Sequence, residues 1–76
     1  MSIIILSKDA KILYSLICKY NNTINDIEKE LYKVYLEYSK VNNIFLYKGK
    51  KIEKFQTLQS NKIKNGDILI FEQVNI

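Results

Sequence analysis

The chain has 76 residues, of which 47% are hydrophobic and 26% charged, with two Gly, no Pro, no His and no Trp. At this length we expect one domain, residues 1–76, with a small core. Without histidine there is no base for a Ser–His or Cys–His pair and no imidazole metal ligand, so we expect no enzyme, no metal and no cofactor.

All twelve basic residues are Lys, against eight acidic residues, and the formal net charge is +4. These lysines are scattered from Lys8 to Lys64, and their densest group, residues 48–54, surrounds a single Gly. Specific nucleic-acid contacts rely on Arg, whose planar fork makes bidentate bonds that an ammonium cannot make. We therefore interpret the lysines as solvated and expect no nucleic-acid partner and no small-molecule substrate.

The number of cysteines and the length of the apolar runs indicate the cellular compartment of the protein. Cys18 is the single cysteine, so the chain has no internal disulfide, which is typical of a reducing compartment. The N-terminal apolar run is only residues 3–6, and no run approaches the ~18 apolar residues that span a bilayer. We expect an intracellular protein of the cytoplasm, the nucleus or an organelle matrix, without a membrane span.

Short apolar runs rich in Ile and aromatic residues predict strands at residues 3–6, 12–18, 44–47 and 68–71. Residues 7–11 are predicted to form a hairpin loop between the first two strands. Gly49 marks a turn before a short strand at 51–53, and Asn65-Gly66-Asp67 is a turn that opens the last strand.

One helix is predicted between the second and third strands, over about residues 23–39. Thr23 is a natural N-cap, and Asp26 follows three residues later as in a capping box. Lys33 and Glu37 are spaced as an i,i+4 ion pair on the solvent side. The apolar stripe that should pack on a sheet consists of Ile24, Ile27, Leu31, Val34 or Tyr35, and Tyr38.

The order of elements is strand, hairpin, strand, helix, strand, short strand, a one-turn segment at 57–61, and a last strand. A helix that crosses between a hairpin and the rest of a sheet favours one sheet packed on one helix. The predicted fold class is α+β, with a mixed sheet of four to five strands.

Motifs along essentially the whole chain resemble ubiquitin. They are the helix entry Thr23-Ile24-x-x-Ile27, the strand–turn–strand unit Phe45-Leu46-Tyr47-Lys48-Gly49-Lys50-x-Ile52, and the later positions Thr57-Leu58, Ile63 and Leu69-x-Phe71. Their order and spacing together carry the resemblance. It implies a β-grasp (ubiquitin-like) roll.

Within this superfamily the chain is similar to the unconjugated, splicing-associated ubiquitin-like branch that ends in two tyrosines. The similarity lies in Cys18, in Thr23-Ile24-x-Asp26-Ile27-x-Lys29-x-Leu31, and in Ile44-x-Leu46-x-Lys48-Gly49. It implies a free adaptor that binds short helical peptides. Asn22 stands where that branch has a peptide-binding acidic residue, and the ending Val74-Asn75-Ile76 lacks the two tyrosines.

The same superfamily includes conjugated modifiers and sulfur carriers, which need a terminal Gly-Gly. The glycines of this chain are Gly49 and Gly66. We therefore expect a non-conjugated protein, unless the natural chain extends beyond Ile76 to a Gly-Gly tail.

Strand alternation predicts which side chains face the helix. The side chains expected to face the helix are Ile3, Ile5, Tyr14, Leu16, Cys18, Phe45, Leu69 and Phe71. The opposite face of the sheet then carries Ile4, Leu6, Leu13, Ile17, Ile44, Leu46, Ile68 and Ile70. Such a face should be mostly polar in a sheet with one packed side. The apolar surplus of the chain is thus predicted to lie on one side of the sheet.

By resemblance, the partner surface of ubiquitin lies on this opposite face, where Leu46 and Ile70 match its apolar patch and Glu72 departs from it. We predict a protein-binding subunit of a larger assembly, with Ile4, Leu6, Ile17, Ile44, Leu46, Ile68 and Ile70 against a partner. The alternatives are the free adaptor, and the modifier precursor of a longer chain. A compositional bias toward Ile on an ordinary surface is the competing explanation of the apolar face.

Overall fold

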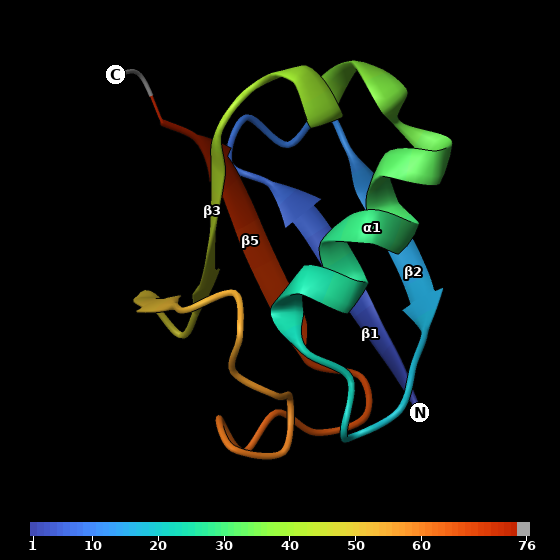
Figure 1. Ribbon diagram of the computed structural model, residues 1–76, viewed down its shortest axis with the longest axis vertical. Coiled ribbons are helices and arrows are strands. Elements are labelled where there is room, and N and C mark those ends of the chain that lie inside the picture. Colours follow the sequence, from blue (N-terminus) through green and yellow to red (C-terminus); the bar gives the residue numbers. More distant parts are fainter. Residues whose placement is uncertain (75–76) are drawn as a thin grey trace.

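The computed structural model describes residues 1–74 (Figure 1). Its elements are β1 (Ser2–Ser7), β2 (Leu13–Ile17), α1 (Ile24–Val34), the 3₁₀ helix η1 (Leu36–Lys40), β3 (Asn43–Tyr47), β4 (Lys50–Ile52) and β5 (Ile68–Gln73). The strands form one sheet in the order β2-β1-β5-β3-β4.

The sheet is mixed. β1 and β5 pair in parallel, whereas β1 with β2, β3 with β5, and β3 with β4 pair antiparallel. The helix α1 lies across one face of the sheet, between the β1–β2 hairpin and β3 in the chain (Figure 1). This α+β arrangement is consistent with a β-grasp roll and confirms the predicted fold class, with five strands.

The start of α1 is capped as the sequence predicts. The Thr23 hydroxyl accepts a hydrogen bond from the Asp26 backbone N–H at 3.1 Å, and the Asp26 carboxylate accepts one from the Thr23 N–H at 3.0 Å. Two N–H groups that a helix leaves unpaired are thereby satisfied. The bond from the Thr23 N–H is also the main reason why the pKa of Asp26 is lowered.

The end of the helix differs from the prediction. α1 ends at Val34, because Tyr35 has φ −119° and ψ 69°, and the chain continues as the separate 3₁₀ helix Leu36–Lys40. The predicted Lys33–Glu37 pair is therefore wrong, since the helical spacing does not reach Glu37. Lys33 instead pairs with Glu30 at 3.0 Å.

A line of aromatic rings explains why the chain turns at this point. Tyr14 packs edge-on to Tyr35 with ring centroids 5.8 Å apart, Tyr35 to Tyr38 at 6.5 Å, and Tyr38 to Phe71 at 5.5 Å. Val34, the other candidate for the stripe, is 53% exposed. Tyr35 therefore provides the contact with the sheet, and packing overrides a local sequence with no Gly or Pro to stop a helix.

The core lies between α1 and the sheet and confirms the predicted inner face. Along β1 and β5 buried side chains alternate with more accessible ones. Tyr14 is half-buried against the core. The buried apolar residues form one cluster: Ile3, Ile5, Ile12, Leu16, Cys18, Ile24, Ile27, Leu31, Phe45, Ile52, Leu58, Ile63, Leu69 and Phe71.

The turns use positive φ where the sequence suggests them. Lys48 and Gly49 have φ of +51° and +79°, the combination that joins β3 and β4 through a tight hairpin. Gly66, at φ +85°, opens the turn into β5. Leu58 and Ile63 anchor the long β4–β5 connection in the core, and Thr57 bridges to Thr23 at the start of α1.

Within residues 1–74, no helix has both the length and the apolar character needed to cross a membrane.

Candidate functional site

The face of the sheet opposite α1 is the candidate site. We call it the outer sheet face. Its residues lie one position out of phase with the buried inner residues of the same strands, which follows from the two-residue period of a strand. They are Ile4, Leu6, Leu13, Ile17, Ile44, Leu46, Ile68 and Ile70.

Strand register brings four of these side chains into one row. Leu6 of β1 lies opposite Leu13 of β2 on one side and opposite Ile70 of β5 on the other. Ile70 in turn lies opposite Leu46 of β3. Directly opposed side chains in a sheet are within contact distance, so the row is continuous across four neighbouring strands.

A second, shorter row lies beside the first. Ile4 of β1 lies opposite Ile68 of β5, one step along the same face from Leu6 and Ile70. On its other side Ile4 faces Ser15, which interrupts the apolar surface on β2. The two rows together make a patch centred on β1 and β5.

Two of the predicted residues lie at the margin of this patch. Ile17 pairs with Ser2 at the end of β2 and is 86% exposed. Ile44 pairs with Glu72, which forms an ion pair with Lys8 at 3.0 Å. The pair of Glu72 and Lys8 gives the patch a charged border at this end, where the resemblance to ubiquitin leads one to expect an aliphatic residue.

Exposure is uneven across the outer sheet face. Leu13 and Ile68 are 71% and 48% exposed, while Ile4, Leu6, Ile44, Leu46 and Ile70 are half-buried by their neighbours. The patch is therefore a mutually packed aliphatic layer with protruding side chains at its edge and at the start of β5.

A hollow of about 420 Å³ lies in the patch, between the β3–β4 hairpin and the turn before β5. Leu6, Leu46 and Ile70 line it on the strands, and Gly49 and Gly66 line it on the turns. Sequence reasoning did not predict this hollow, because it depends on how two turns from distant parts of the chain come together.

One hydrogen bond fixes the two turns relative to each other. The Tyr47 hydroxyl donates to the Asp67 carboxylate at 2.6 Å, and this bond is the main cause that lowers the pKa of Asp67. The same bond raises the pKa of Tyr47. The hollow is thus bounded by a pair whose charge state is constant around neutral pH.

The exposed apolar residues are not confined to the outer sheet face, contrary to the sequence-based expectation. Val34 at the end of α1 and Leu36 at the start of η1 are 53% and 65% exposed, and Phe55 in the β4–β5 connection is 78% exposed. Phe55 is distant in the chain from Val34 and Leu36, and none of the three belongs to a strand of the sheet. They provide control positions for any experiment on the outer sheet face.

Cys18 is buried, as the strand alternation predicts. Burial raises the pKa of its thiol, which opposes formation of the nucleophilic thiolate. Across residues 1–74 no group of three or more His, Cys, Asp or Glu side chains is placed to hold a metal ion.

A partly buried polar network under η1 was not predicted from the sequence. The Glu28 carboxylate accepts a hydrogen bond from the Tyr32 hydroxyl at 2.7 Å and pairs with Lys54. The Asn43 amide donates to the Tyr32 hydroxyl at 2.8 Å. Burial, followed by the bond to Glu28, raises the pKa of Tyr32. The network ties β3 to α1 through partly buried side chains.

In comparison with known proteins, no family model and no curated protein matches this chain.

Proposed function

We propose that this chain is a protein-binding domain of the ubiquitin-like type, without enzymatic activity, that docks on a partner protein through the outer sheet face. In this role it is a small constitutive subunit of a larger assembly. The support for the ubiquitin-like type is the order of elements together with the motifs at the helix entry and around Gly49.

The observation that carries the proposal is the row Leu13, Leu6, Ile70 and Leu46. A sheet that packs on one side normally presents polar side chains on the other. Here aliphatic side chains lie side by side across four strands, flanked by Ile4 and Ile68. Contiguous exposed apolar surface of this kind is typical of protein–protein interfaces.

The free adaptor that binds helical peptides is the second candidate. A groove of about 340 Å³ between β2 and α1, bordered by Asn22 and Asp26, favours it. Against it, the Asn22 side chain is already engaged, because its oxygen accepts a hydrogen bond from the Lys19 N–H at 2.8 Å. The modifier precursor requires residues beyond Ile76, and Asn75 and Ile76 themselves lie outside the described residues.

The test compares two double variants in co-purification from the source organism. Leu46→Lys with Ile70→Lys changes the row, and Leu36→Lys with Phe55→Lys makes the same chemical change at exposed positions off the face. We expect the first to lose partner binding by about 100-fold or more, since charges replace the centre of the interface. The second should bind like the wild type.

Circular dichroism on both variants controls for folding. Equal retention of partners by the two folded variants would contradict the proposal. Light scattering on the isolated wild-type chain then separates the two candidates. Self-association or strong binding of an apolar dye indicates a subunit that lacks its partner, whereas a monodisperse monomer indicates the adaptor.

A further inference from the structure

The two edges of the sheet are built differently. β2 forms one edge (Figure 1) and β4 forms the other. β4 spans three residues and carries Lys50 and Lys51, and a short, lysine-bearing strand protects an edge against pairing with another chain. β2 spans the five residues Leu13–Ile17, has no charged residue and no proline, and pairs with β1 without a bulge. The edge at β2 therefore has none of these protections.

Every second residue of β2 directs its backbone groups away from β1. The ladder is antiparallel, so pairs that exchange two hydrogen bonds alternate with pairs that exchange none. The Ser7 N–H donates to the Ile12 carbonyl at 3.0 Å. The Cys18 N–H donates to the Met1 carbonyl at 2.8 Å. Even-numbered residues therefore bond to β1, and the backbone groups that point to the free edge belong to Leu13, Ser15 and Ile17. Within residues 1–74, no other segment hydrogen-bonds to these three.

The exposed side chains of this edge are arranged symmetrically about Ser15. Leu13 and Ile17 lie two positions to either side of it, and their side chains are 71% and 86% exposed. When two copies of β2 pair antiparallel with Ser15 opposite Ser15, Leu13 of each copy lies opposite Ile17 of the other. All of these pairs are of the hydrogen-bonded type, because the free N–H and C=O groups belong to the same residues. The edge is therefore complementary to itself in both its backbone and its side chains.

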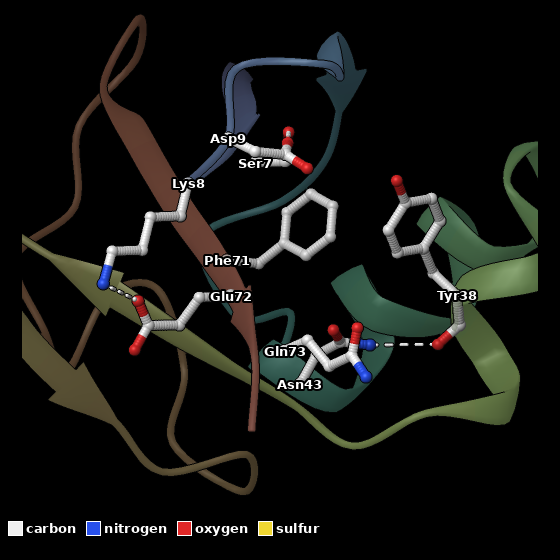
Figure 2. Close-up of a pocket in the computed structure, with 8 residues that line it drawn as sticks. All are labelled: Ser7, Lys8, Asp9, Tyr38, Asn43, Phe71, Glu72 and Gln73. Carbon is white, nitrogen blue, oxygen red and sulfur yellow. Dashed lines mark hydrogen bonds and ion pairs between the residues drawn. The ribbon is translucent and has the colours of Figure 1, made fainter. Parts of the chain in front are cut away.

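The edge is also accessible and held in place. A groove of about 340 Å³ lies between β2 and α1, and Ser15 at the middle of the strand is exposed. The turn that joins β2 to β1 is fixed by Ser7 and Asp9, which lie side by side (Figure 2). The Ser7 hydroxyl donates to the Asp9 carboxylate at 2.7 Å and accepts a bond from the Ile12 N–H at 2.9 Å. The strand thus needs no rearrangement to receive another strand.

We propose that β2 is a self-association edge, at which two copies of this chain pair antiparallel about Ser15 and form one continuous sheet. The apolar row that begins at Leu13 then continues into Ile17 of the other copy. The rest of that row, Leu6, Ile70 and Leu46, stays uncovered. The pairing therefore goes beyond the proposed docking function and leaves the centre of the outer sheet face free for a different protein.

The isolated dimer is weak. One short strand per copy buries less area than the roughly 1,200 Å² of the smallest stable interfaces, so we expect a dissociation constant on the order of 100 µM. The register also brings Lys11 of each copy near Lys19 of the other, and each copy carries a net charge of +4. Added salt should therefore strengthen the pairing, because it screens this repulsion. Unfolding experiments at about 5 µM concern the monomer, whereas an assembly that holds two copies together reaches about 1 mM locally and populates the pair.

An amide NMR dilution series of the full chain, from about 1 mM to about 10 µM, tests the edge directly. At 1 mM about one fifth of the chains remain unpaired, so the amide protons of Leu13, Ser15 and Ile17 should exchange with solvent about fivefold more slowly than at 10 µM. Those of Tyr14 and Leu16, already bonded to β1, should change little. Concentration-dependent changes at the centre of the outer sheet face with none on β2 would overturn the proposal. A chain that is monomeric at 1 mM would overturn it too, and would leave the edge to a strand of another protein.

Charge variants test the register. Leu13→Lys with Ile17→Lys sets ammonium groups opposite each other, and Leu13→Glu with Ile17→Glu does the same with carboxylates, so each variant alone should be monomeric at 1 mM. An equimolar mixture of the two should form a heterodimer at least as tight as the wild-type dimer, because opposite charges then face each other. Sedimentation equilibrium measures the association, and circular dichroism checks that both variants fold. A mixture that stays monomeric, or a variant that dimerises alone like the wild type, contradicts the proposal.

Two further variants separate the edge from net charge and from the docking surface. Leu36→Lys with Phe55→Lys adds the same charge at exposed positions away from β2 and should retain most of the dimer at 1 mM. A loss equal to that of Leu13→Lys with Ile17→Lys would mean that net charge alone governs the association, which contradicts the proposal. Leu46→Lys with Ile70→Lys should also retain the dimer while it loses the docking partner. Failure of either proposal is therefore distinguishable from failure of the other.

Discussion

The two faces of the same sheet are both rich in aliphatic side chains but differ in their exposure. On β5, Leu69 and Phe71 are 0% and 1% exposed, while Ile68 and Ile70 alternate with them on the other side and remain accessible. On β1 the same holds for Ile3 and Ile5 against their neighbours. Aliphatic character alone therefore does not separate the buried face from the accessible face. The two faces are separated by the position of each residue within the two-residue period of its strand.

The largest expected effect on folding comes from comparing a lysine substitution at two neighbouring positions of β5. Leu69→Lys places an unpaired ammonium in the core, where burial of a charge costs more than a domain of this size can tolerate, so the chain should not fold. Ile70→Lys places it on the outer sheet face and should leave the chain folded. Circular dichroism and amide NMR spectra show whether each variant is folded. If both variants are unfolded, the outer sheet face is also core.

Truncation to alanine should reveal the same contrast in a graded form. Phe45→Ala removes a fully buried ring that stacks on Phe71 and should lower the free energy of unfolding by about 3–5 kcal/mol. Ile68→Ala, at a 48% exposed position, should lower it by less than about 1 kcal/mol. Urea denaturation measures both values, and similar losses would remove the distinction between the faces.

Acid should weaken the Tyr47–Asp67 hydrogen bond, which bounds the hollow in the outer sheet face. Since the pKa of Asp67 is lowered below 3.8 in the folded chain, mainly by the Tyr47 hydroxyl, the bond stabilises the folded state above that pH. The contribution is lost as the pH falls through the lowered folded value.

Tyr47→Phe removes this bond and tests that expectation. The variant should unfold at a lower urea concentration than the wild type near neutral pH, and the difference should shrink at about pH 2. A difference that stays constant with pH would mean that the hydroxyl acts through packing and not through the ionised carboxylate.

The smallest effect is expected at the margin of the patch. Ile17→Ser changes a side chain that is 86% exposed and should alter the free energy of unfolding by no more than about 0.5 kcal/mol. Thermal and urea unfolding should coincide with the wild type. A clear loss of stability would show that Ile17 packs on the sheet more than its exposure indicates.

Local signals in the sequence predict much of this fold. The Ile-rich runs, the Thr23 and Asp26 capping pair, and Gly49 and Gly66 at positive φ act over a few residues, and all are present in the structure. The alternation along each strand likewise predicts the two faces. Such features need no knowledge of distant contacts.

What the sequence did not predict depends on contacts between distant segments. The end of α1 at Val34 is decided by packing of Tyr35 against Tyr14, which no local signal marks. The burial of Asn43 depends on the Tyr38 carbonyl of η1 and on the Tyr32 hydroxyl of α1. The hollow of the outer sheet face likewise arises only when two turns approach each other.

The most direct test of the docking account is site-specific photo-crosslinking in the source organism. Benzoylphenylalanine would replace Leu13 or Ile68, both exposed on the outer sheet face, and in separate strains Leu36 or Phe55, exposed elsewhere. The account predicts that positions 13 and 68 crosslink to the same partner protein, and that positions 36 and 55 do not. Crosslinks to that partner from 36 and 55, with none from 13 and 68, would contradict it.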